Sequence, residues 1–212
     1  MTDSDQSNST SENNGTSADY RRILNESARL LRANRPGEAI AVLEPLQADM
    51  PDDPDIAINM GGALILQRKW SKAVETLKKA VTASPDNVLL WTNLAAAYLG
   101  RLETSGPKHQ ARAIAAYERA LWIDPSTPNV HYHLGLIYKQ QGNLSRSSAM
   151  FQRALEINPN DRDARYWMEK LSDQLVERER EKRENRSQQA RGDAKRGANG
   201  RLPDQGGEES QQ

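Results

Sequence analysis

The sequence has no cysteine and a single phenylalanine, and aromatic residues make up only 5% of its 212 residues. Without cysteine there can be no disulfide bond, thiolate metal ligand or cysteine nucleophile. No stretch stays apolar over the roughly 20 residues that a transmembrane helix needs. The N-terminal region also lacks the basic and apolar segments of a secretory signal. We therefore expect a soluble, cytoplasmic protein without a membrane segment.

The chain also has no excess of charge of either sign, since 29 Lys and Arg residues balance 29 Asp and Glu residues. A neutral chain gives no bulk electrostatic reason to bind nucleic acid or a membrane. Hydrophobic residues reach only 36%, which suits an extended helical array better than a compact globule. Residues 1–18 and 187–212 are so polar that we expect both ends to be disordered.

Between these ends the sequence repeats itself with a period of 34 residues, interrupted once by a six-residue insertion. Small residues, prolines and short polar residues all follow this spacing, and we predict that the short polar residues are helix N-caps. Pro54 and Pro128 follow two of these caps, at the first helical position, where proline is tolerated. The three series are Ala39, Ala73, Ala113 and Ser147; Pro51, Pro85, Pro125 and Pro159; and Asp19, Asp53, Asn87, Thr127 and Asp161.

A 34-residue unit with two helices, A and B, resembles the tetratricopeptide repeat. The stretches "WTNLAAAYLG" and "HYHLGLIYKQQGNLSRSSAMFQRALEINP" carry the resemblance best. It implies an all-α, right-handed α-solenoid of four hairpins and a C-terminal capping helix with a charged extension. It also implies that a small eighth residue (Ser27, Gly61, Ala95 or Gly135) lets helices A and B approach closely. The four repeats would be residues 20–53, 54–87, 88–127 and 128–161, and the capping helix residues 162–186.

One polar column runs through the repeats at their sixth position, where the residues are Asn25, Asn59, Asn93 and His133. In the tetratricopeptide family helix A lines the concave groove, so the resemblance implies that this column faces a ligand. The column looks like the asparagine ladder in the repeat domain of O-GlcNAc transferase. An amide offers a donor and an acceptor side by side, which matches a peptide unit. The alternative is that these polar residues serve only the structure of the repeat itself.

The resemblance places further apolar residues in the groove, among them Leu24, Ile58, Ile65 and Tyr132. An apolar surface that no neighbouring hairpin covers indicates a partner protein, unless the capping helix or tail of the chain fills it. Co-chaperones of this family grip the acidic end of Hsp70 or Hsp90 with Lys, Asn and Arg at fixed positions. Only the asparagines match that pattern here, so we expect a different partner.

The sequence shows no carboxylate pair, Ser–His arrangement, glycine-rich phosphate loop or zinc pattern. His131 and His133 lie two positions apart on a helix, on different sides, so they cannot share one metal. We therefore expect no enzyme activity, no cofactor and no metal. The leading hypothesis is a non-catalytic adaptor or assembly factor that binds an extended segment of another protein in the groove.

Two other functions stay open. One is a self-associating scaffold of unknown oligomeric state, and the other is an RNA- or ribosome-associated factor that acts through the basic residues of 178–201. Interleaved glutamates and the lack of aromatics in that segment favour a solvated helix end over nucleic-acid binding. The insertion lies within "GRLETSGPKHQ", residues 100–110. It is either specific for a partner or a tolerated loop.

Overall fold

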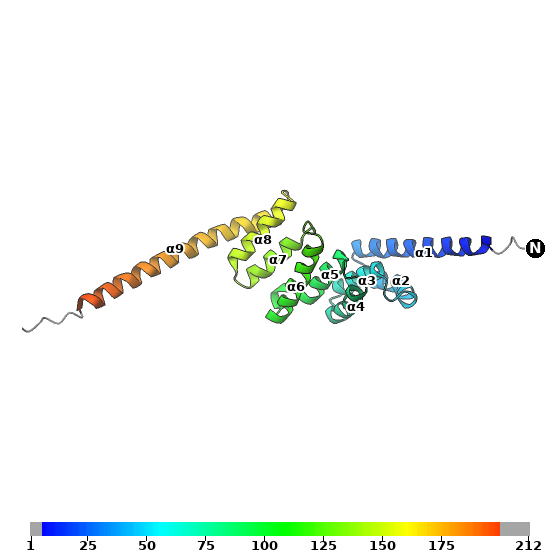
Figure 1. The fold of residues 1–212 in the computed structure, drawn as a ribbon, viewed down its shortest axis with the longest axis horizontal. Coiled ribbons are helices and arrows are strands. Elements are labelled where there is room, and N and C mark those ends of the chain that lie inside the picture. The colour runs from blue at the N-terminus through cyan, green and yellow to red at the C-terminus, as the bar shows by residue number, and fades with distance from the viewer. Residues whose placement is uncertain (1–5, 200–212) are drawn as a thin grey trace, which may run out of the picture.

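The computed structural model describes the backbone of residues 6–199 and the side chains of residues 18–191. Within that part, the chain forms nine α-helices, one short 3-10 helix and no strand. Successive helices form hairpins that stack side by side into an elongated array (Figure 1). The all-α solenoid predicted from the sequence is therefore confirmed.

Each hairpin consists of a helix A and a helix B. Helix α1 contacts α3, and α3 contacts α5. Each of these A helices also contacts the B helix of its own hairpin. Each hairpin therefore buries its apolar face against the next. The short helix η1 (Leu102–Thr104) lies in the third hairpin, and α9 (Arg162–Asn199) follows the fourth. The hairpins are α1 (Gln6–Arg32) with α2 (Pro36–Asp49), α3 (Pro54–Leu66) with α4 (Trp70–Ala83), α5 (Val88–Leu99) with α6 (Pro107–Ile123), and α7 (Val130–Gln140) with α8 (Leu144–Ile157).

Glycine at the eighth repeat position sets how closely helices A and B approach. A Cβ atom placed on Gly61 would lie 2.7 Å from the Leu77 side chain, and one on Gly135 would lie 2.8 Å from the Phe151 ring. No real Cβ tolerates such distances, so only glycine fits in the second and fourth hairpins as they are packed. The close approach predicted for the eighth position is present at both glycines.

Three of the predicted N-caps are present. The Asp53 carboxylate accepts hydrogen bonds from the backbone N–H groups at the start of α3, and the Asn87 side chain does the same for α5. The Asp161 carboxylate accepts from the backbone N–H groups of Asp163 and Ala164 in α9. These caps fix where α3, α5 and α9 begin, since they satisfy N–H groups that have no partner within the helix.

The other two predicted caps are wrong. Asp19 lies inside α1, which already begins at Gln6. The Thr127 hydroxyl donates to the carbonyl oxygen of Asp124, 2.6 Å away. Helix α7 begins only at Val130, after Asn129 in the left-handed conformation with φ 63°. The turn therefore occupies the Thr127 hydroxyl, and Pro128 precedes the helix instead of opening it.

Helix α9 covers the last hairpin with its first four turns. Ala164 and Leu171 are buried there, and Trp167, Met168 and Leu175 pack against the same cluster around Phe151. Farther along, α9 is solvent-exposed and carries ion pairs between successive turns, for example Arg180 with Glu184 and Lys182 with Glu179. The capping helix is thus present, together with its charged extension.

The ends of the array differ from the sequence prediction. Residues 6–18 and 187–199 are helical, whereas we predicted disorder over 1–18 and 187–212. Once a helix is nucleated in a packed hairpin, each further residue adds a hydrogen bond at little entropic cost, so a polar segment can continue it. Helices α1 and α9 project from opposite ends of the array (Figure 1). Residues 1–5 and 200–212 lie outside the described part of the chain.

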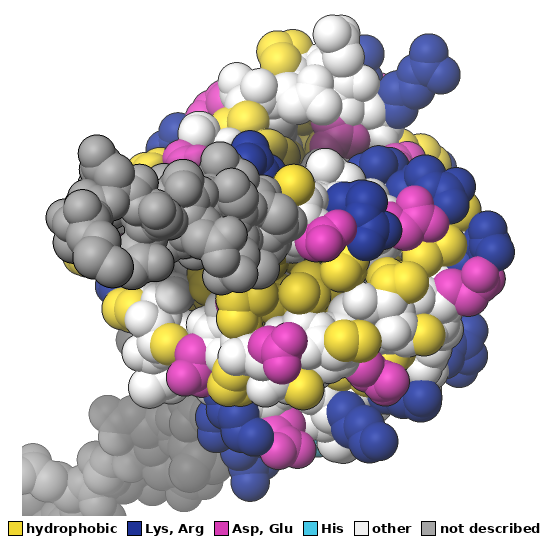
Figure 2. All heavy atoms as spheres, turned by 90° about the vertical axis from the view of Figure 1, so that its right-hand side faces the viewer, with side chains coloured by type: hydrophobic (Ala, Val, Ile, Leu, Met, Phe, Trp, Pro, Cys, Tyr) yellow, Lys and Arg dark blue, Asp and Glu magenta, His cyan; other side chains and the backbone are white. Residues whose placement is uncertain are grey.

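Positive and negative side chains are mixed on the surface (Figure 2), as expected from their equal numbers in the sequence. Seen toward the α1 end, lysines and arginines lie among aspartates and glutamates around the rim, and hydrophobic side chains gather nearer the middle (Figure 2). Over the described residues, no helix is both long and apolar enough to cross a membrane.

Candidate functional site

The asparagine column ties consecutive A helices together. The side-chain amide nitrogen of Asn59 donates to the carbonyl oxygen of Leu24, 3.3 Å away, and to the Ser27 hydroxyl, 2.9 Å away. The amide nitrogen of Asn93 donates to the carbonyl oxygen of Ile58, 3.2 Å away. Both carbonyl bonds reach back 35 residues, to the fifth position of the preceding repeat. The sequence reasoning left a structural role open but did not identify this link between repeats.

The side-chain oxygens of Asn59 and Asn93 accept no hydrogen bond from the described part of the chain. Both side chains are half-buried, and within residues 18–191 nothing donates a hydrogen bond to the Oδ1 atom of Asn59 or Asn93. The bond made by the amide nitrogen therefore fixes the orientation of the oxygen. Asn25 is exposed, and its side chain makes no hydrogen bond in the described part of the chain because α1 is the first helix of the array.

In the fourth repeat the column changes character. The His133 ring stacks on Tyr117 of α6, with ring centroids 5.7 Å apart and planes 11° apart, and meets the edge of Tyr132 at 5.7 Å. Burial lowers the pKa of His133 below its ordinary value. Helix α6 is 17 residues long, against 14 for the other B helices, and α7 packs on α6 and η1. The third repeat, which carries the insertion, thus packs against the last hairpin through α6 and η1.

The apolar residues predicted for the groove are not fully free. Leu24, Ile58 and Ile65 are half-buried and pack against the core of the first three hairpins. Tyr132 packs against Phe151, with ring centroids 5.6 Å apart, and joins the cluster that α9 completes through Trp167. The capping helix therefore uses part of the surface that the sequence assigned to a ligand.

Two cavities adjoin these elements. At the end of the column, Tyr132, His133, Asp161 and Asp163 line a cavity of about 310 Å³. A second cavity of about 470 Å³ lies between the start of α4 and the insertion. The sequence reasoning missed the second one, although the signal was present in arginines placed within and just after the inserted residues. Among the described residues, no three His, Asp or Glu side chains are grouped so that they could hold a metal ion.

Comparisons with known proteins agree on one family. Residues 30–97 and 128–161 match models described as tetratricopeptide repeat, and residues 110–142 match one described as TPR repeat. Together these matches cover more than half of the chain. The peroxisomal targeting signal receptor of Candida albicans is 28% identical over 96 residues, which are 45% of this chain and 15% of that protein. This chain covers between 14% and 16% of the length of the first curated relatives that it matches.

Solved structures share the fold. A thermophilic TPR protein of Thermus thermophilus superposes with a TM-score of 0.64 at 19% identity, over 73% of this chain and 82% of that one. The first TPR of Spaghetti (RPAP3), bound to the HSP90 peptide SRMEEVD, superposes with a TM-score of 0.52 at 26% identity. That match covers 58% of this chain and 93% of the other.

Proposed function

This chain belongs to the tetratricopeptide repeat family, and we propose that it is a non-catalytic adaptor that binds an extended segment of another protein across α1, α3 and α5. The observation that supports this most is the fixed orientation of Asn59 and Asn93. Their amide nitrogens are held by the preceding helix, and their oxygens have no internal partner among the described residues. A ligand N–H group would meet an acceptor that is already ordered, which reduces the entropy lost on binding.

The spacing of the helices suits an extended ligand. Packed helices lie about 8–10 Å apart, and an extended chain advances about 3.3 Å per residue. A ligand that crosses the A helices therefore presents an equivalent backbone group to successive asparagines about every third residue. A segment of roughly seven residues would span Asn25, Asn59 and Asn93 on these dimensions.

The charges near the column indicate what such a segment carries. Past Asn93, the column ends at the cavity whose lining includes Asp161 and Asp163, and two carboxylates attract a lysine or arginine of the ligand. At the other end, Leu24 and Ile58 stand where the family's carboxylate clamp has cations. We therefore propose a partner segment that is basic at one end, unlike the acidic HSP90 peptide bound to the RPAP3 domain.

Selection of linear peptides on the full chain tests this function. A phage-displayed library of seven-residue peptides would be panned on the protein, and affinities of the selected peptides measured by fluorescence polarisation. Because Asn25 has no internal hydrogen bond, Asn25→Ala should weaken binding about fivefold, the equivalent of one net hydrogen bond, and leave unfolding unchanged. Asn160→Ala, which changes an exposed asparagine in the α8–α9 loop, serves as the control.

The result that would contradict the proposal is equally clear. If no linear peptide is enriched, or if the selected peptides bind Asn25→Ala as tightly as the unmodified protein, the ligand does not cross the asparagine column as proposed.

A further inference from the structure

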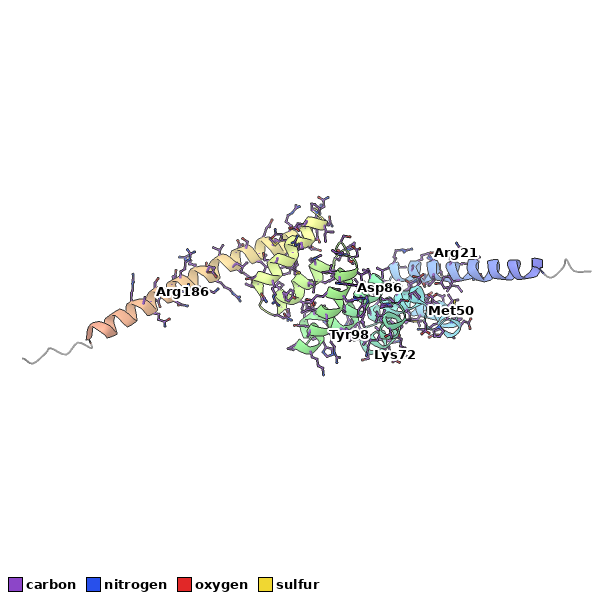
Figure 3. All side chains as sticks on the ribbon, viewed as in Figure 1. Arg21, Met50, Lys72, Asp86, Tyr98 and Arg186 are labelled. Carbon is purple, nitrogen blue, oxygen red and sulfur yellow. The ribbon has the colours of Figure 1, made fainter. Side chains whose placement is uncertain are left out.

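The insertion of the third repeat forms one wall of the 470 Å³ cavity. The opposite wall comes from the start of α4, with Trp70 and Val74, and the floor from the end of α5, with Tyr98. Tyr98, which is labelled in Figure 3, marks this edge of the array near the end of α5. The asparagine column does not line this cavity, so it is separate from the groove of the proposed function.

The inserted residues are ordered by specific contacts. Gly100 turns the chain with φ 58°, and a Cβ atom at this position would lie 3.7 Å from the Trp70 ring. Leu102 packs against the core of the third and fourth hairpins. The buried Gln110 side chain donates to the Ser105 carbonyl, 2.9 Å away, and accepts from the Gln141 side chain at 3.1 Å. The inserted residues therefore have a defined conformation, and they form one wall of the cavity.

The cavity is cationic and aromatic. Arg101, His109 and Arg112 line it, and none of its lining residues is Asp or Glu. The Arg112 guanidinium lies over the Tyr98 ring, 5.8 Å from its centroid. Neither arginine forms an ion pair with any residue of the described chain, and the buried hydroxyl oxygen of Ser105 has no hydrogen-bond partner there. Free cations beside an unsatisfied hydroxyl suit an anionic ligand.

We propose that this cavity is a second binding site, which takes an acidic segment of a partner protein. Carboxylates of the segment pair with Arg101 and Arg112, and an apolar side chain of the segment packs against Trp70. A volume of about 470 Å³ is within the usual range of small binding pockets and is lined, as such pockets are, by apolar walls with a few polar groups.

The same chemistry does not favour nucleic acid. A nucleic-acid site gains its affinity from many phosphate contacts along a basic stripe. Here two arginines and one histidine line a single cavity on a chain of zero net charge. A short acidic peptide can satisfy both arginines at once, whereas a polynucleotide would extend beyond them onto a surface of mixed charge.

The fourth repeat supplies a matched control. Arg146 lies over the Tyr138 ring, 5.6 Å from its centroid, and both residues occupy the same repeat positions as Arg112 and Tyr98. This repeat has no insertion, and Arg146 does not line the cationic cavity. Replacing Arg146 removes the same charge and the same contact with an aromatic ring, but leaves the proposed site intact.

The test is a titration of the isotope-labelled full chain, followed by NMR at the Trp70 indole N–H and the Gly100 amide. The probe is a capped pentapeptide of alternating Asp and Leu, compared with the same peptide carrying Asn for Asp and with a short oligouridylate. We expect the acidic peptide to shift both signals and the neutral peptide to bind at least about tenfold more weakly. The double variant Arg101→Gln/Arg112→Gln should weaken acidic-peptide binding about tenfold, whereas Arg146→Gln should match the unmodified protein.

Both arginines are exposed, so the double variant should melt like the unmodified protein. Arg112→Lys keeps the positive charge and should retain most of the affinity. This variant separates loss of charge from any loss of folding. The proposal is overturned if the double variant binds the acidic peptide unchanged, if the neutral peptide binds equally well, or if oligouridylate binds more tightly than the peptide. Because Asn25→Ala leaves this cavity untouched, it should bind the acidic peptide normally even if the groove proposal fails.

Discussion

The side-chain amide of Asn93 donates to the carbonyl oxygen of Ile58, 3.2 Å away and one repeat earlier in the chain. Asn59 makes the same contact with Leu24. Asparagine is a poor helix former because its side chain competes for backbone hydrogen bonds, yet it recurs inside three successive A helices. At Asn59 and Asn93 the recurrence has a structural reason, since the amide links each helix to its predecessor.

Removing this link should lower stability. Asn93→Ala should reduce the free energy of unfolding by about 1 kcal/mol through one lost hydrogen bond, and Asn59→Ala should reduce it further because that side chain loses two. The better helix propensity of alanine offsets only a few tenths of that. Urea denaturation followed by circular dichroism measures the change, with Asn25→Ala as the control because Asn25 has no such bond. Equal denaturation midpoints for all three variants would show that the link contributes nothing.

The contact between Gly135 and Phe151 gives a second prediction. A Cβ atom on Gly135 would lie 2.8 Å from the ring, which is buried and cannot move aside without disturbing the α8–α9 core. Gly135→Ala should therefore destabilise the protein by about 1–3 kcal/mol through overpacking, and Gly135→Leu by at least as much. Gly106→Ala is the matched control, since nothing lies within 4 Å of that position. Thermal melting curves that coincide for Gly135→Ala and Gly106→Ala would contradict this close packing.

The sequence predicted where helices A and B approach closely, because a small residue recurs at the eighth position of every repeat. It did not predict the opposing side chains, which the structure identifies as Leu77 for Gly61 and Phe151 for Gly135. The partner of Asn93 is instead a backbone carbonyl, which has no sequence signature, and its contact depends on how neighbouring A helices are offset. The cationic cavity is formed in part by the inserted residues, which no other repeat has. The repeat period therefore could not predict its shape.

The burial of His133 against Tyr117 predicts that stability depends on pH. In the unfolded chain the imidazole takes up a proton near pH 6.5, whereas burial lowers its pKa in the folded chain. Between these two values the unfolded state binds more protons, so stability is full above about pH 6.5 and falls as the pH drops below it.

The free energy of unfolding should therefore be lower at pH 5 than at pH 7.5, and His133→Phe should reduce that difference. Part of the difference should remain, since burial also lowers the pKa of His131. Urea denaturation at the two pH values measures the effect, and the exposed His109 provides the control as His109→Ala. If His133→Phe leaves the difference unchanged, protonation of His133 is not what destabilises the protein in acid.

The last prediction concerns Gln110, which holds the insertion in place. Its side chain is 5% exposed and bridges the Ser105 carbonyl and the Gln141 amide. Gln110→Ala removes both hydrogen bonds and leaves the Ser105 carbonyl without its partner, so the free energy of unfolding should fall by about 1–3 kcal/mol. Backbone amides of residues 101–106 should also exchange with deuterium faster than in the unmodified protein, because the insertion loses its main polar anchor. Gln152→Ala, which removes an exposed side chain bonded only to Glu156, should change neither quantity. If exchange over residues 101–106 stays the same in Gln110→Ala, Leu102 alone is enough to order the insertion, and the cavity wall does not depend on the glutamine bridge.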